Sequence, residues 1–132
     1  MKPKFIIGNQ HSDSRGRLLF NNDFDISEVK RIYVIENSSV DFIRAWQGHK
    51  IEQRWFSAMR GSFEIKLIAI DDWDKPNPLL ECETFQLKSG NLDILHIPSG
   101  YVSSIKALED NSRRLLLQTI FLTKFQTNID MN

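Results

Sequence analysis

The chain has 132 residues, of which 41% are hydrophobic and only one is a cysteine. Nine Phe, three Trp and two Tyr supply enough large apolar side chains for one folded domain over residues 1–132, which excludes a disordered segment or a coiled coil. Seventeen basic residues balance seventeen acidic ones, so no net charge draws the chain to nucleic acid or to an anionic membrane.

The sequence also bears on where the protein works. No apolar run approaches the roughly 18 residues that a membrane-spanning helix needs. The opening residues, MKPKF, lack the apolar core and the small-residue cleavage site of a signal peptide. The lone Cys82 excludes an internal disulfide, which fits a reducing compartment. We therefore expect a cytoplasmic protein with no membrane association.

Short strand-like segments follow one another along the chain, and none shows a strong helical period. Residues 62–67 alternate apolar and charged side chains, the period-two pattern of a half-buried strand. The other predicted strands are 29–35, 42–47, 54–59, 84–87, 92–97 and 115–122. A turn at Gly48 is expected to join the second and third segments of that series, and the proline-rich segment 71–80 (DDWDKPNPLL) is expected to be a loop. Many short strands with almost no helix predict an all-β antiparallel sandwich or barrel.

Polar and aromatic side chains concentrate at 44–54, RAWQGHKIEQR. Strand alternation sends Arg44 and Trp46 to one face and Gln47 to the other, and Arg54 can fall on the face of Arg44. Two Arg, a Trp and a His in this segment can form a polar pocket with an aromatic wall. A charged, solvated strand edge fits the same periodicity.

A second polar cluster, HSDSRGR, occupies residues 11–17. It fits an ordinary surface turn. It also fits an anion clamp, in which Arg15 or Arg17 binds phosphate through its planar set of donors.

Taken together, these motifs resemble those of the small sugar-nucleotide cupins. In chain order they are DSRG at 13–16, KRIY at 30–33, RAWQGHK at 44–50, RG at 60–61 and IPSGY at 97–101. The resemblance is to the dTDP-4-dehydrorhamnose 3,5-epimerases and, more closely, to the dTDP-4-dehydro-6-deoxyglucose 3,4-ketoisomerases. It implies a cupin-type antiparallel β-barrel (double-stranded β-helix, or jelly roll), usually a homodimer, that acts on a keto sugar carried by a nucleoside diphosphate such as dTDP.

The resemblance also implies roles for individual side chains. A ketone at C4 acidifies the hydrogens on C3 and C5, so isomerisation needs a base, a donor that stabilises the enolate and an acid that returns the proton. Arg15 and Arg44 match positions that hold phosphate or sugar. Arg54 falls near the reacting carbonyl, and Tyr33 matches an aromatic residue of the pocket. The remaining expected substrate-binding residues are Trp46, Gln47 and Tyr101.

The base of the family's first motif is a His at the position of Gln47, and an amide does not accept a proton near neutral pH. The ketoisomerases carry a second His two positions later, which this chain retains as His49. The later His of the family, near Ser103, is absent. These departures disfavour 3,5-epimerisation and leave ketoisomerase chemistry to His49, whose imidazole titrates near pH 6.5 when unperturbed.

Metal-binding cupins present three His and a Glu at positions where this chain has Gln47, His49, Arg54 and a Ser near 103. One ligand of four, with an Arg beside it, repels a cation, so we expect no metal and no cofactor.

Three functions follow from these observations. The first is a metal-independent isomerase or epimerase of a nucleotide-linked 4-keto-6-deoxy sugar, 3,4-ketoisomerase-like, in surface polysaccharide biosynthesis. The second is a non-catalytic nucleotide-sugar-binding module that has lost its base, and the third is a structural partner whose only function is to dimerise. A homodimer is expected, with residues 5–7 and the apolar C-terminal run as its candidate surface.

Overall fold

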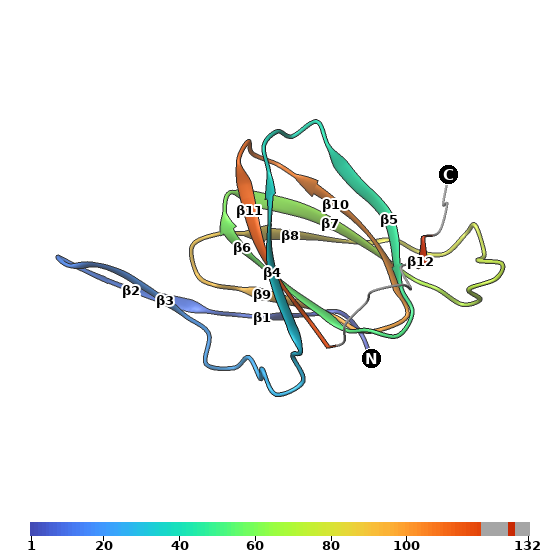
Figure 1. Ribbon diagram of the computed structural model, residues 1–132, viewed down its shortest axis with the longest axis horizontal. Helices are drawn as coiled ribbons and strands as arrows, with labels where there is room; N and C mark the ends of the chain where they lie inside the picture. The colour runs from blue at the N-terminus through green and yellow to red at the C-terminus, as the bar shows by residue number, and fades with distance from the viewer. Residues whose placement is uncertain (120–126, 129–132) are drawn as a thin grey trace.

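A computed structural model describes residues 1–119 and 127–128 (Figure 1). In this part of the chain the structure consists of β-strands joined by turns and loops, and it contains no helix that could cross a membrane. The strands are β1 (Lys4–Ile6), β2 (Asn9–Asp13), β3 (Gly16–Phe20), β4 (Arg31–Asn37), β5 (Ile43–His49), β6 (Arg54–Arg60), β7 (Ser62–Ala69), β8 (Glu83–Lys88), β9 (Ile94–Ile97), β10 (Tyr101–Ala107), β11 (Ser112–Gln118) and β12 (Thr127–Asn128). The all-β prediction is confirmed.

Ten of these strands form two five-stranded antiparallel sheets. One sheet has the order β1-β9-β6-β11-β4, and the other has the order β12-β5-β10-β7-β8. Apolar side chains of both sheets pack into one core, with Phe56 and Leu116 from the first sheet and Phe63, Ile65 and Leu67 from the second. The apolar residues of the alternating segment 62–67 thus face this core, since every second side chain of a strand points to the same side.

Most strand boundaries differ from the prediction by one or more residues, and two of the differences bear on the site. Residue Gly48 does not form a turn, because β5 continues through it to His49 and pairs with Val102 of β10. Strand β11 begins at Ser112 rather than 115, and residues 120–122 of the predicted strand lie outside the described residues. Strand β10 was not predicted at all.

The N-terminal cluster forms a two-stranded arm rather than a simple turn. Within residues 1–119 and 127–128, strands β2 and β3 pair only with each other, and Figure 1 shows them extending away from the two sheets. The predicted break at Gly16 is present, since this residue adopts a φ of 137°, which favours glycine. Every residue of β2 is exposed.

A β-bulge interrupts the alternation of β5. Ser103 of β10 pairs with Gln47, but Ile105, two residues further along, pairs with Arg44. The extra residue on β5 lies between these two pairs, so Arg44 and Gln47 point to the same side of the strand. The prediction that they would point to opposite faces was therefore wrong.

Part of the candidate dimer surface is covered within the chain itself. Phe5 packs against the main core and Ile6 against a second, smaller cluster that contains Trp55 and Ile94. Only Ile7 of this segment is largely exposed, at 64%.

Candidate active site

A small cavity of about 80 Å³ lies among strands of both sheets. Its polar lining residues are Tyr33, Arg44, Gln47, Arg54 and Arg114, and its apolar lining residues are Ile35, Phe56, Ile105 and Leu116. The bulge of β5 is what brings two of these polar side chains to the cavity together. Four of the predicted site residues therefore converge on this cavity, namely Tyr33, Arg44, Gln47 and Arg54.

Three guanidinium groups approach this cavity without a matching set of carboxylates. The Nε atoms of Arg44, Arg54 and Arg114 are all buried, and none has a hydrogen-bond partner among the described residues. Arg54 has one neighbouring carboxylate, with its Nη2 atom 3.8 Å from Oε1 of Glu52. Buried N–H groups without acceptors are costly, so this arrangement favours an anionic or carbonyl-bearing ligand.

Arg114 is the most buried of the three, at 1% exposure. Its Nη1 donates a hydrogen bond of 3.0 Å to Oδ1 of Asn37, and its guanidinium lies 5.3 Å from the ring centroid of Phe63 and 5.7 Å from that of Phe56. Burial lowers the pKa of Arg114 to about 10, and the nearby charges of Arg44 and Arg54 act in the same direction. The group therefore keeps its charge at neutral pH.

His49 lies beyond Gln47 on β5 and is almost completely buried, at 2% exposure. Its Nδ1 atom is 2.7 Å from Oε1 of Glu52, which is also buried. On the other side of the ring, Nε2 is 3.4 Å from the hydroxyl of Ser103. The imidazole is thus held between a carboxylate and a hydroxyl.

The pKa shifts of this pair fix its protonation. Burial lowers the pKa of His49, and the charge of Arg54 adds to this, although Glu52 opposes the shift. Burial alone would raise the pKa of Glu52, but hydrogen bonds from His49 and the backbone, with the charges of His49 and Arg54, bring its pKa below the ordinary value. Glu52 is ionised and can only accept, so Nδ1 carries the hydrogen and Nε2 keeps a free lone pair. That is the tautomer of a general base.

Tyr33 completes the polar wall of the cavity. Its hydroxyl donates a hydrogen bond of 2.9 Å to Oε1 of Gln118, a buried residue at the end of β11. The guanidinium of Arg31 lies 5.3 Å from the Tyr33 ring centroid. Burial lowers the pKa of Arg54, and the neighbouring carboxylate of Glu52 opposes part of this shift.

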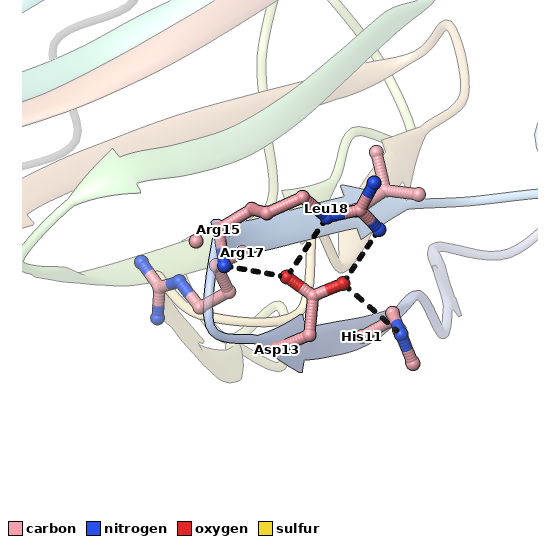
Figure 2. Close-up of a pocket in the computed structure, with 6 residues that line it drawn as sticks. His11, Asp13, Arg15, Arg17 and Leu18 are labelled. Carbon is pink, nitrogen blue, oxygen red and sulfur yellow. Dashed lines mark hydrogen bonds and ion pairs between the residues drawn. The ribbon is translucent and has the colours of Figure 1, made fainter.

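Four predicted site residues are not among those that line this cavity: His49, described above, and Arg15, Tyr101 and Trp46. Arg15 lies on the β2–β3 arm, where its side chain is 88% exposed and its Nη2 atom is 2.7 Å from Oδ2 of Asp13 (Figure 2). Tyr101 packs in the main core, and its hydroxyl donates a 3.4 Å hydrogen bond to the carbonyl of Met1. Trp46 is half-buried on β5 and is not among the lining residues.

Sequence reasoning missed Arg114 and did not assign a role to Glu52. Arg114, Leu116 and Gln118 are alternate residues of β11, so their side chains point to the same, buried side of the strand. A charged residue on a buried strand face was the available signal. Glu52 follows His49 by three residues, outside the strand, and its contact depends on the turn between β5 and β6.

The residues of this site do not suit a metal ion. Over residues 1–119 and 127–128, no three His, Cys, Asp or Glu side chains are grouped so that they could hold one. The residue next to the His49–Glu52 pair is Arg54, a cation that would repel a metal ion, and not a third metal ligand. The expected absence of a metal stays a prediction.

Known structures provide a comparison for the fold. No protein-family model matches the chain, and no curated protein matches it either. Among solved structures, it is similar to the TDP-quinovose 3,4-ketoisomerase WlaRB of Campylobacter jejuni, with a TM-score of 0.73 and 24% identity over 96% of this chain and 92% of the other. It is also similar to the 3,4-ketoisomerase QdtA of Thermoanaerobacterium thermosaccharolyticum in complex with TDP-4-keto-6-deoxyglucose, with a TM-score of 0.73 and 18% identity over 99% and 88%.

A third similar structure is the dTDP-4-dehydrorhamnose 3,5-epimerase of Bacillus anthracis with TDP and PPi bound. Its TM-score is 0.74, at 13% identity over 92% of this chain and 74% of the other. All three identities are below 25%, so the likeness shows the fold alone. The chain thus has the fold of these three structures, which belong to the two enzyme groups that the motifs resemble.

Proposed function

We propose that the protein is an isomerase of a nucleotide-linked 4-keto-6-deoxy sugar, of the 3,4-ketoisomerase type, and that it works without a metal. The observation that carries this proposal is the buried pair of His49 and Glu52, which leaves the lone pair of Nε2 as the basic site, together with Arg54, which lines the cavity and lies 3.8 Å from Glu52. A base of this kind and positive charge for an enolate are the two requirements of proton transfer next to a ketone.

The reaction can be written on these side chains. Nε2 of His49 removes the hydrogen from C3, and the electron pair forms a C3=C4 enediolate whose oxygen charge faces Arg54. The hydroxyl proton of O3 passes to O4, for which the Tyr33 hydroxyl is the proposed carrier, and this moves the negative charge to O3. The protonated imidazole, stabilised by Glu52, then returns a proton to C4. The ketone moves from C4 to C3, and no atom is gained or lost.

Substrate binding belongs to the same proposal. Arg44 and Gln47 are proposed to bind the substrate, because both line the cavity. The Ser103 hydroxyl contacts Nε2 and must give way to the C3 hydrogen for the transfer to occur. Trp46 and Tyr101 receive no role, and Arg15 receives none within a single subunit, since its arm lies away from the cavity. A dTDP-linked sugar of polysaccharide biosynthesis is the proposed substrate.

Incubation with dTDP-4-keto-6-deoxyglucose in deuterated water tests the reaction directly. We expect a 3-keto product that carries solvent deuterium at C4. Mass spectrometry and NMR measure the deuterium and its position. The variant His49→Asn is expected to reduce the exchange rate by about 10²- to 10⁴-fold, the usual contribution of a positioned base. The matched control is His96→Asn, because His96 pairs with Gln53 and stacks on Trp55 instead of contacting the Glu52 pair.

Two results would contradict the proposal. One is tight binding of the nucleotide sugar, measured by calorimetry, with no deuterium incorporation. That outcome would indicate a non-catalytic binding module, which the amide at Gln47 would suit. The other is full exchange by His49→Asn, which would remove His49 from the role of base.

We also propose that the protein forms a homodimer through the outer face of the sheet that contains β4, β6 and β11. A groove of about 220 Å³ on this sheet is lined mainly by apolar side chains, among them Trp55, Leu115 and Leu117. Ile32, which also lines this groove, is 64% exposed, and Val34 of the same strand is 50% exposed. An apolar sheet face of this kind is stabilised when a second copy covers it.

A further inference from the structure

The hydroxyl of Tyr33 is held by a residue that does not itself line the cavity. Tyr33 belongs to the cavity wall, and its Oη donates a hydrogen bond of 2.9 Å to Oε1 of Gln118. Gln118 is the last residue of β11 and is 1% exposed. Its backbone pairs with Arg31 of β4 on one side and with Arg54 of β6 on the other. The hydrogen bond therefore ties a cavity side chain to the interior of a five-stranded sheet.

This hydrogen bond determines what the Tyr33 hydroxyl presents to a ligand. A phenol hydroxyl has one hydrogen, which it can donate, and lone pairs, which can accept. Because the hydrogen is donated to Gln118, the lone pairs of the oxygen remain for the cavity. The guanidinium of Arg31, 5.3 Å from the ring centroid, is a second contact of the same side chain. In the free protein Tyr33 is thus an acceptor toward the cavity.

Acceptors are scarce in this cavity. Its three arginines, Arg44, Arg54 and Arg114, have only donors. Among the lining residues that the structure describes, only Tyr33 and Gln47 have a side-chain oxygen. The carbonyl of a keto sugar accepts hydrogen bonds and suits the arginines, whereas the hydroxyl beside the carbonyl needs an acceptor for its own hydrogen. The Tyr33 oxygen meets that need in the orientation that Gln118 imposes.

We propose that Gln118 is a positioning residue, which orients the Tyr33 hydroxyl so that its oxygen accepts the proton of O3 and the transfer from O3 to O4 can begin. This inference rests on the proposed function and deepens it, because it names the group that prepares Tyr33 for that step. As the Tyr33 oxygen takes the proton from O3, its own hydrogen leaves Oε1 of Gln118 and passes to O4. One proton is received and one is given, so Tyr33 ends the step neutral and Gln118 ends it unchanged.

The enediolate has two fates, and their ratio reports on this step. When the proton has moved from O3 to O4, the imidazolium of His49 protonates C4 and the 3-keto product forms. When the proton has not moved, the imidazolium returns its proton to C3 and the substrate is regenerated. In deuterated water the second fate places deuterium at C3 of the recovered substrate. The ratio of C3 exchange to product formation therefore measures the transfer, and it does not depend on the fraction of folded protein.

The variant Gln118→Met removes the acceptor and keeps the length of the side chain. We expect it to raise the ratio of C3 exchange to product formation by about 3- to 10-fold, the usual effect of one hydrogen bond. Gln118→Glu keeps an oxygen acceptor, so its ratio is expected to stay within about twofold of the wild type. The matched control is Gln86→Met, since Gln86 is an exposed residue of β8 that pairs with Glu64 outside the cavity. A ratio in Gln118→Met equal to that of the wild type would overturn the inference.

A double variant tests whether Gln118 acts through Tyr33. Tyr33→Phe removes the proposed carrier, so we expect it to raise the ratio more than Gln118→Met does. In the Tyr33→Phe background, Gln118→Met is expected to cause no further change, because the hydroxyl that it would position is absent. A further rise in the double variant would show that Gln118 acts on the reaction by another route, which contradicts a positioning role.

A measurement without substrate distinguishes this inference from the proposed function. The chain has two tyrosines, so tyrosine labelled with ¹³C at Cζ gives two NMR signals, which Tyr101→Phe assigns. We expect Gln118→Met to shift the Tyr33 signal and Gln86→Met to leave it in place. A shifted signal, with a wild type that neither exchanges nor isomerises, would reject the isomerase although the contact is made. An active wild type, with an unshifted signal and an unchanged ratio in Gln118→Met, would keep the isomerase and reject the role of Gln118.

Discussion

The side chains around His49 show how burial sets the protonation state of the proposed base. The imidazole has almost no contact with solvent, so its neutral form is favoured even though an ionised Glu52 lies 2.7 Å away. Glu52 does not need to raise the basicity of the ring. It holds the hydrogen on Nδ1 and stabilises the imidazolium that forms during transfer.

This arrangement has a consequence for stability at different pH values. The pKa of His49 and that of His96 are both lowered, mainly by burial, so the folded chain binds fewer protons than the unfolded chain once the pH falls below about 6.5. Stability therefore decreases as the pH falls. We expect the urea midpoint to be constant from pH 8 to 7 and to fall progressively between pH 7 and 5.

The variants His49→Gln and His96→Gln show how much each imidazole contributes to the pH dependence of the urea midpoint. Each is expected to make the pH dependence shallower than that of the wild type in the same window. A midpoint that stays constant down to pH 5, or a slope unaffected by either substitution, would show that these imidazoles protonate freely in the folded protein.

The strands illustrate what local sequence can and cannot predict. Strand β7 was predictable because its apolar and charged residues alternate with the pleat. Strand β10 was missed because Ser103 and Ser104 are buried on it, and polar residues inside a strand are recognisable only once their partners are known. Pairing across the sheet supplies that information, and a single sequence does not.

The same limit applies to the site. Tyr33, Arg44, Gln47 and Arg54 were identified from motifs, and they do converge. Their relative orientation was not predictable, because the bulge of β5 depends on the register with β10 rather than on any turn residue. Arg114 comes from a strand distant in sequence, and only the tertiary fold brings it to the cavity.

The turn between β6 and β7 offers a test of local packing. Gly61 joins the two strands with a φ of 74°, and a Cβ atom there would lie 2.2 Å from Oγ of Ser112. We expect Gly61→Ala to lower the free energy of unfolding by about 1–3 kcal/mol more than Gly90→Ala does. Gly90 is the control because it also has a positive φ, of 127°, with open space around it. Equal effects in chemical denaturation would remove the clash with Ser112 as the cause.

On the level of the assembled protein, the proposed dimer makes a definite prediction. Light scattering at micromolar concentration is expected to give twice the mass of the chain. Val34→Lys places a charge on the outer apolar face, so we expect it to shift the protein toward the monomer. Ile7→Lys changes the exposed residue of the N-terminal segment and tests the alternative surface. If only Ile7→Lys dissociates the dimer, the interface lies at the N-terminal segment and not on the outer sheet face. A monomeric wild type would refute the dimer.

The arm of β2 and β3 differs from the body of the molecule in one further way. Its strands pair only with each other, so the outer edges of this ribbon expose backbone amides that no neighbouring strand protects. An isolated pair of strands is marginally stable in water, whereas β7 and β10 lie inside a five-stranded sheet. In a lone subunit, amide hydrogen exchange will therefore be fast throughout the arm and slow in β7 and β10, and the ribbon will melt separately from the rest of the fold.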